Sequence, residues 1–307
     1  MPGGAAVIQL YCGLSERSWN TIPVPESAGP FMAAANRLKP IAPGTSDVML
    51  DSGAFGDNER LSFAGAMERQ QAFEKYSDFV SSAWVAYDVL IDEKWDSAGN
   101  RHKKRWSEQE ADWAIRETIK ANEFLALADT GQRQRVHPVQ GVTARQQGYC
   151  ADAVIPIANE TGGILGLGGW CIIGWAPPTS DLRKSLEWTF WDSMWHIVPT
   201  AARADIQHIH IFGVMVADIL GGLLWLCDQH GIATVSTDSS GPQKRPAANG
   251  IWGYADWMRR CYFPPGPPRG FARIEHVKQV RRWLTGFRST RYYKCPPRPA
   301  AYQLRLF

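Results

Sequence analysis

Hydrophobic residues along the chain fall into short strand-like runs that alternate with segments of helical spacing. The strand-like runs are apolar or β-branched and lie at 7–12, 48–50, 84–87, 136–139, 163–169, 208–212 and 233–236. Apolar positions recur with helical spacing at 64–79, 107–128, 144–159, 181–202 and 216–230. Strands that alternate with helices favour a parallel sheet. About seven or eight such strands fit a closed TIM-type (β/α)8 barrel better than an open sheet.

The alternation ends near residue 240. Residues 241–307 contain Pro-rich loops and one segment of helical spacing, at 274–287. We therefore predict a (β/α) barrel core at 1–240, which the C-terminal extension at 241–307 closes as part of the same domain. No apolar run approaches the roughly 20 residues that cross a bilayer, so we expect no membrane attachment.

Charge is distributed unevenly between these two parts. The formal net charge is +3, yet residues 1–240 carry 19 Lys and Arg against 28 Asp and Glu, whereas 241–307 carry 14 against two. A basic segment of this density attracts phosphate backbones, and its many aromatic residues could stack on unpaired bases. We interpret it as a nucleic-acid-binding extension; the candidate phosphate contacts are Arg281, Arg282, Arg288 and Arg291. The alternative is a basic layer packed on an acidic body, with the aromatic residues in its own core.

Two further sequence features concern possible nucleic-acid contact and the cellular compartment. The basic run at 101–105 is interpreted as a solvated loop that could also touch a phosphate backbone. The six cysteines are scattered and form no CxxC pair, and the N-terminus lacks the features of a signal peptide. These patterns predict free thiols in a reducing, cytoplasmic compartment.

Polar side chains follow four of the predicted strands. Asp51 and Asp238 each close an apolar run and precede small residues, and Asp88 and Gln140 follow two other runs. Because parallel strands flanked by helices bring their C-terminal ends together, we expect these four groups to converge on one site. Taken singly, such an aspartate is more often a helix N-cap or a turn residue.

Glycines and histidines add two weaker signals. The glycine-rich run at 162–169 does not fit GxGxxG, and no Walker lysine is present, so Gly168 and Gly169 are assigned to close approach of a flat ligand. Tight packing at a bend of the barrel is the alternative. His208 and His210 alternate in a strand and share one face like metal ligands, but packing or hydrogen bonding is favoured.

Six short motifs occur in the order found in the tRNA-guanine transglycosylases, which the chain resembles over about residues 47–240. These motifs are Asp51-Ser-Gly-Ala-Phe55, Tyr87-Asp88, Val139-Gln-Gly141, Leu167-Gly-Gly169, His210-Ile-Phe-Gly-Val214 and Thr237-Asp238. The resemblance implies a TIM barrel that exchanges guanine for a 7-deazaguanine without breaking the sugar-phosphate backbone. The family's zinc site uses a CxCxxC cluster and a distal His. Here Cys261 and Cys295 stand apart with His276 between them, so we expect no metal and no other cofactor.

The resemblance also assigns roles to individual residues. Asp238 would attack the anomeric carbon of the sugar, and Asp51 would act as general acid and base. Asp88 would accept hydrogen bonds from the donor edge of guanine. Gln140 would donate to the carbonyl of the base, helped by backbone N–H groups near Gly168 and Gly169. Phe55 would stack on the purine.

The compact length and the Thr237–Ser240 context look more like the branch of this family that acts on DNA. We therefore expect a DNA-guanine transglycosylase whose partners are DNA and a free base, 7-cyano-7-deazaguanine or a relative. Oligomerisation and a strand-opening accessory protein are left open. A tRNA-acting enzyme is the alternative within the class. A non-catalytic nucleic-acid-binding subunit is the alternative outside it, and the presence of both Asp51 and Asp238 argues against that reading.

Overall fold

A closed barrel of parallel strands forms the centre of the protein. The computed structural model describes residues 5–14, 30–35, 47–54, 62–77, 80–91, 93–95, 101–103, 105–174, 176–239, 278 and 280–298. Eight parallel strands pair in the closed order β1-β10-β9-β8-β7-β4-β3-β2. They are β1 (Val7–Leu14), β2 (Phe31–Ala34), β3 (Val48–Asp51), β4 (Ala83–Val85), β7 (Gln134–Val139), β8 (Ile164–Leu167), β9 (His208–Ile211) and β10 (Thr234–Ser239). The predicted TIM-type (β/α)8 fold is confirmed.

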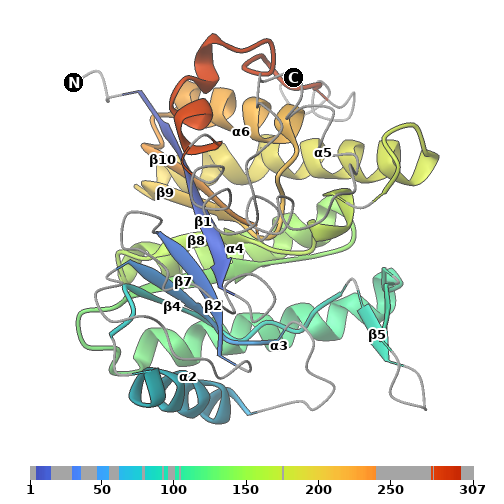
Figure 1. Ribbon diagram of the computed structural model, residues 1–307. Helices are drawn as coiled ribbons and strands as arrows, with labels where there is room; N and C mark the ends of the chain where they lie inside the picture. The colour runs from blue at the N-terminus through green and yellow to red at the C-terminus, as the bar shows by residue number, and fades with distance from the viewer. Residues whose placement is uncertain are drawn as a thin grey trace, which may run out of the picture.

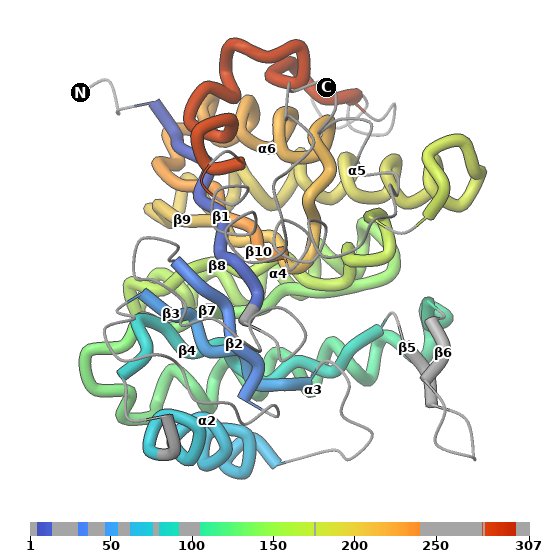
Figure 2. The backbone as a smooth tube through the Cα atoms, in the orientation of Figure 1, coloured from blue at the N-terminus to red at the C-terminus, as the bar shows by residue number. Residues whose placement is uncertain are grey.

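Helices surround this barrel (Figures 1 and 2). They are α2 (Phe63–Ser77), α3 (Glu108–Leu127), α4 (Ala144–Glu160), α5 (Asp181–Arg203) and α6 (Ala217–His230), with short 3-10 turns η2 (Cys171–Gly174) and η4 (Phe287–Ser289). A capping box begins α3, because Ser107 accepts from the Glu110 N–H while the Glu110 side chain accepts from the Ser107 N–H. None of the helices in the described part is long and apolar enough to cross a bilayer.

Alternation along the strands divides their side chains between two apolar layers. One buried cluster fills part of the barrel and includes Tyr11, Met32, Met49 and Val136, with Phe212 packed against it. The neighbouring positions on the same strands point outward and join the larger cluster under the helices. This period of two fixes the strand register, since a shift by one residue would exchange the two layers.

Two elements were missed by the sequence pattern. Strand β2 completes the barrel by pairing with β1 and β3. An antiparallel hairpin, β5 (Glu93–Trp95) with β6 (Arg101–Lys103), occupies part of the segment that we had interpreted as a solvated loop. Its strands are short and charged, so they carry no apolar alternation. Figure 1 places the hairpin beside the N-terminal end of α3.

The described C-terminal segment packs beside α6 (Figure 1). Residues 280–285 are helical, as the sequence predicted, and η4 follows. The rings of Trp283, Phe287 and Tyr292 contact one another, with centroids 4.4 to 6.4 Å apart. Phe287 and Tyr292 also belong to the main buried cluster, so this segment packs on the body of the protein, as the alternative interpretation expected, but its aromatic rings do not form a separate core.

Candidate active site

The C-terminal ends of the barrel strands carry the predicted catalytic and base-reading residues. Asp51 is the last residue of β3, and Asp238 is the second-last residue of β10. Gln140 directly follows β7, and Asp88 lies three residues beyond β4. Because the eight strands are parallel, these positions lie at one end of the barrel. Phe55, predicted to stack on the base, lies outside the described residues.

The carboxyl group of Asp51 has a raised pKa. Burial raises its pKa to about 6, and the negative charge of Asp238 adds to this effect. Backbone hydrogen bonds from Gly53 and Ser52 and the charge of Arg69 act in the opposite direction without cancelling it. The influence of Asp238 requires the two carboxyl groups to lie near one another. Asp51 is thus an acid poised to exchange a proton close to neutral pH.

Asp238 is surrounded by hydrogen-bond donors instead. Its Oδ1 accepts from the Gly213 N–H at 2.7 Å and lies 3.3 Å from His210 Nε2. Oδ2 accepts no hydrogen bond from the described residues, and the side chain is 22% exposed. With its contacts on one oxygen, the carboxyl group leaves the second oxygen accessible for bond formation. This is the arrangement that a carboxylate nucleophile requires.

A tight turn holds the Gly213 donor in place. Gly213 has φ 67°, a conformation that side chains disfavour. A Cβ on this residue would lie 2.5 Å from Cys171 Sγ, which itself donates to the carbonyl of Phe212. Only glycine fits here, which explains the glycine of the His210–Val214 motif.

His208 and His210 make hydrogen bonds inside the barrel, as the sequence favoured. His208 Nε2 lies 2.6 Å from Ser236 Oγ, and His210 Nδ1 lies 2.8 Å from the same oxygen. Burial lowers the pKa of His208 to about 3, so this ring is neutral. No group of three or more His, Cys, Asp or Glu in the described part of the chain is arranged to hold a metal. Cys261 and His276 lie outside that part.

Asp88, which follows β4, and Gly168, which follows β8, lie close together. A Cβ built on Gly168 would lie 3.9 Å from Asp88 Oδ2 and 3.7 Å from Gln140 Cβ, so three predicted base-binding residues are neighbours. The Gly168 N–H already donates to the Val139 carbonyl at 2.8 Å. Gly168 therefore offers close approach rather than a donor. Gly169, with φ 80°, takes a conformation that glycine favours.

Gln140 is fully buried and its orientation is fixed. Nε2 lies 2.6 Å from the Val89 carbonyl and 2.6 Å from Thr118 Oγ1. A carbonyl only accepts, so the atom facing Val89 must be Nε2 and not Oε1. Both N–H groups are then in use, and Oε1 has no partner among the described residues. The predicted donation from Gln140 to a base carbonyl does not fit this geometry; the side chain offers an acceptor.

Arg105 is a site residue that the sequence did not reveal. Its guanidinium donates to the carbonyls of Gly169 at 2.8 Å, Gly141 at 3.3 Å and Val142 at 3.2 Å. It also lies over the ring of Trp170, 5.3 Å from the centroid. Arg105 thus ties the segment after the β5–β6 hairpin to the two loops that follow β7 and β8. It was hidden in a basic run that resembles a solvated loop.

The four candidate phosphate contacts divide into two pairs. Arg281 donates to the carbonyls of Leu10 and Pro30 at 3.1 and 2.9 Å, and Arg288 forms a two-pronged ion pair with Asp228 at 2.7 and 2.9 Å. These contacts attach the C-terminal segment to the barrel. Arg282 and Arg291 are exposed. The structure therefore does not bring the four arginines together as one surface.

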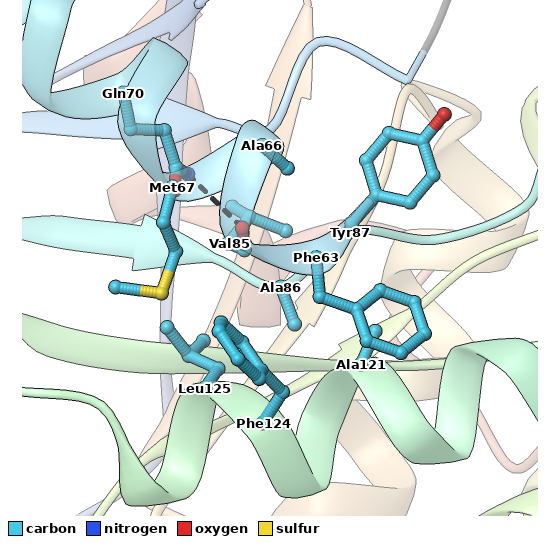
Figure 3. A pocket seen from close by; sticks show the side chains of 10 residues that line it. All are labelled: Phe63, Ala66, Met67, Gln70, Val85, Ala86, Tyr87, Ala121, Phe124 and Leu125. Carbon is cyan, nitrogen blue, oxygen red and sulfur yellow. Dashed lines mark hydrogen bonds between the residues drawn. The ribbon is translucent and has the colours of Figure 1, made fainter. Parts of the chain in front are cut away.

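An apolar hollow lies between α2, α3 and the segment at the end of β4 (Figure 3). Phe63, Met67 and Phe124 line it, and the hydroxyl of Tyr87 points away from it. Its volume is about 10 Å³, room for about one water molecule. It is too small for a purine and contains none of the predicted catalytic groups.

Comparisons with known proteins add little to this geometry. The sequence matches no protein-family model and no curated protein. Among solved structures, the fold is similar to a putative fructose-1,6-bisphosphate aldolase from Coccidioides immitis, at 11% identity and a TM-score of 0.37, over 92% of this chain and 90% of that one. A likeness this weak carries no argument about fold or function.

Proposed function

We propose that this protein is a DNA-guanine transglycosylase, which exchanges guanine in DNA for a 7-deazaguanine such as 7-cyano-7-deazaguanine. One observation carries the proposal: two neighbouring carboxyl groups at the C-terminal end of the barrel have opposite surroundings. Burial raises the pKa of Asp51 to about 6, whereas the Gly213 N–H and the His210 ring face Oδ1 of Asp238. A pair of acids with separated roles is what base exchange through a covalent intermediate requires.

In the first step, Asp238 Oδ2 attacks C1′ of the deoxyribose from the face opposite guanine. The bond between C1′ and the base breaks, and Asp51 gives its proton to the departing guanine. The product is an ester between Asp238 and the sugar. The hydrogen bond from Gly213 remains on Oδ1, which becomes the carbonyl oxygen of this ester. The sugar-phosphate backbone stays intact throughout.

In the second step, the ionised Asp51 accepts the ring N–H proton of the incoming 7-deazaguanine. The nitrogen attacks C1′, the ester bond breaks, and Asp238 leaves as a carboxylate. Two inversions restore the original configuration, and the enzyme returns to its starting protonation. Water must be excluded while the ester exists, because hydrolysis would leave an abasic site.

Recognition of the base follows from the donors and acceptors at the strand ends. Asp88 supplies two acceptor oxygens for the ring N–H and the exocyclic amine that guanine and 7-deazaguanines share. Gln140 Oε1 adds a third acceptor, and the Gly169 N–H is the backbone donor proposed for the base carbonyl. Gly168 lets the base approach the backbone beside Asp88. A target guanine must first leave the DNA stack, which costs a few kcal/mol.

The test is incorporation of a radiolabelled 7-deazaguanine into DNA and, in parallel, into tRNA. We expect label in DNA only, no incorporation by Asp238→Ala, and DNA binding by this variant close to that of the wild type. Asp51→Asn should slow exchange by about a hundredfold or more, the size of a general acid-base contribution. Label in tRNA alone would favour the alternative substrate. Full activity of Asp238→Ala would remove Asp238 from the mechanism.

A further inference from the structure

A chain of hydrogen bonds runs through the barrel interior to the proposed nucleophile. It connects His208, Ser236, His210 and Asp238, which alternate between the paired strands β9 and β10. The successive distances are 2.6, 2.8 and 3.3 Å. His210 and Ser236 are fully buried, so water does not compete for these bonds. None of the steps proposed above uses His208, Ser236 or His210.

The chemistry of the groups gives this chain one direction when Asp238 is ionised. A carboxylate only accepts, so His210 must carry its proton on Nε2. In this tautomer His210 accepts at Nδ1, and among the described residues the Ser236 hydroxyl is the donor there. Having given its proton to His210, Ser236 accepts from His208 Nε2–H. Each hydrogen bond therefore fixes the orientation of the next.

We propose that His210 is a positioning residue for Asp238, and that Ser236 and His208 lock His210 in the tautomer that donates to Oδ1. The catalytic consequence rests on the proposed function, whereas the tautomer does not. Through this bond, His210 holds Oδ1 against the Gly213 N–H and leaves Oδ2 to meet the sugar. The same donor stabilises the carboxylate when the ester breaks, which helps the incoming base to displace Asp238.

The surroundings of His210 keep the imidazole in this position. The Tyr11 ring meets it edge-on with centroids 5.8 Å apart, and the Phe212 ring does so at 4.7 Å. The other titratable groups near it are His208, Tyr11 and the two acids of the site. His208 is neutral, and burial raises the pKa of the Tyr11 hydroxyl far above neutrality.

His137 provides a control with the opposite tautomer. This buried ring lies outside the barrel, with Nδ1 3.0 Å from Asn122 Oδ1. Asn122 Nδ2 donates to two carbonyls, of Thr118 and Pro138, so its amide cannot be reversed. Asn122 Oδ1 therefore accepts, and His137 carries its proton on Nδ1. Burial lowers the pKa of His137 to about 4, so the ring is neutral and holds only this proton.

The direct experiment is ¹⁵N NMR of the histidine rings in the substrate-free protein at pH 7. We expect Nε2–H for His208 and His210 and Nδ1–H for His137. Ser236→Ala should leave His210 as a mixture of tautomers, and Ser236→Thr, which keeps the hydroxyl, should restore one. An Nδ1–H signal from His210 in the wild-type protein would overturn the proposal whatever the enzyme does.

The kinetic experiment separates positioning from folding. His210→Gln places a side-chain N–H near Asp238, whereas His210→Phe removes it. We expect kcat of the Phe variant to fall about tenfold to hundredfold, the range for losing a hydrogen bond that orients a functional group, with the KM for the base unchanged. The Gln variant should keep most of kcat, and His137→Gln should alter thermal stability alone. Equal losses in both His210 variants would overturn the proposal. Absence of exchange in the wild-type protein would reject the proposed function and leave the tautomer result standing.

Discussion

At the scale of single residues, the two aspartates of the site have the same side chain but different surroundings. Asp51 is half-buried and lies near another negative charge, so its ionised form is disfavoured. Asp238 faces the Gly213 N–H and the His210 ring, which contact one of its two oxygens. Exchanging a proton and attacking a sugar need these different surroundings. The local donors, rather than the residue type, decide the roles.

The raised pKa of Asp51 predicts a cost in stability. Its pKa is about 6 in the folded protein and 3.8 as the ordinary value, so the folded state binds the proton more tightly than the unfolded state. Stability therefore falls as the pH rises from about 4 to 6, and the full penalty remains above pH 6. Asp51→Asn removes the charge and should stabilise the protein by about 1 to 2 kcal/mol at pH 8, allowing for partial exposure.

Urea unfolding of Asp51→Asn and the wild type at a series of pH values between 8 and 4 measures this difference. The advantage of the variant should shrink steadily as the pH falls below 6. Asp181→Asn, at a fully exposed side chain, serves as the control and should change stability by less than about 0.5 kcal/mol. A variant no more stable than the wild type at pH 8 would contradict the assigned cost.

At the scale of elements, the loops after two strands, β7 and β8, are held by the same side chain, Arg105. Arg105 donates to carbonyls on both loops that follow β7 and β8, and Gln147 of α4 donates to Gly141 and Gly168 at 3.0 and 3.2 Å. These bonds hold Gly168 and Gln140 in the positions proposed for base recognition. The loops carry the function, while the charged and amide groups behind them supply the rigidity.

Arg105→Met keeps much of the apolar stem and removes these donors. We expect the KM for the 7-deazaguanine base to rise about tenfold, because the loops that form the base site lose their restraint, with a smaller effect on the KM for DNA. Stability should fall by about 1 to 3 kcal/mol, because the partly buried carbonyls of Val142 and Gly169 lose this donor, whereas Gly141 keeps the bond from Gln147. Arg116→Met, at an exposed position of α3, should change neither quantity. A rise in the KM for DNA alone would place Arg105 on the nucleic acid instead.

Elements with a clear apolar period were predictable from the sequence, and those without it were not. In the sequence, apolar residues of the five helices recur with a period of about 3.6 residues. Seven of the barrel strands stand out as short apolar or β-branched runs. Strand β2 is four residues long and lies far from the neighbouring apolar runs. The strands of the β5–β6 hairpin are mostly charged, so their sequences show no alternation of apolar and polar residues. The acceptor role of Gln140 depends on Val89 and Thr118, 51 and 22 positions away, which no local pattern connects.

At the scale of the whole molecule, the basic C-terminal segment is attached to the barrel through its own charges. Arg288 pairs with Asp228 of α6, which also accepts from the Ala6 N–H and the Tyr293 hydroxyl. The net positive charge of residues 241–307 was visible in the sequence. Which arginines face inward was not, because their partners lie 60 or more positions away.

This division of the arginines predicts two separable effects. Arg288→Ala leaves Asp228, which is 12% exposed, without its countercharge, so stability should fall by about 3 kcal/mol. Arg282→Ala with Arg291→Ala removes exposed side chains, of which Arg291 also contacts Tyr292, so it should lower the melting temperature less than Arg288→Ala does and should weaken DNA binding. If each contacts one phosphate, the slope of log affinity against log salt concentration should fall by about two in magnitude. Differential scanning fluorimetry and DNA titrations at several salt concentrations measure both effects on the same preparations. An unchanged salt slope in the double variant, with an intact fold, would assign nucleic-acid contact to other residues.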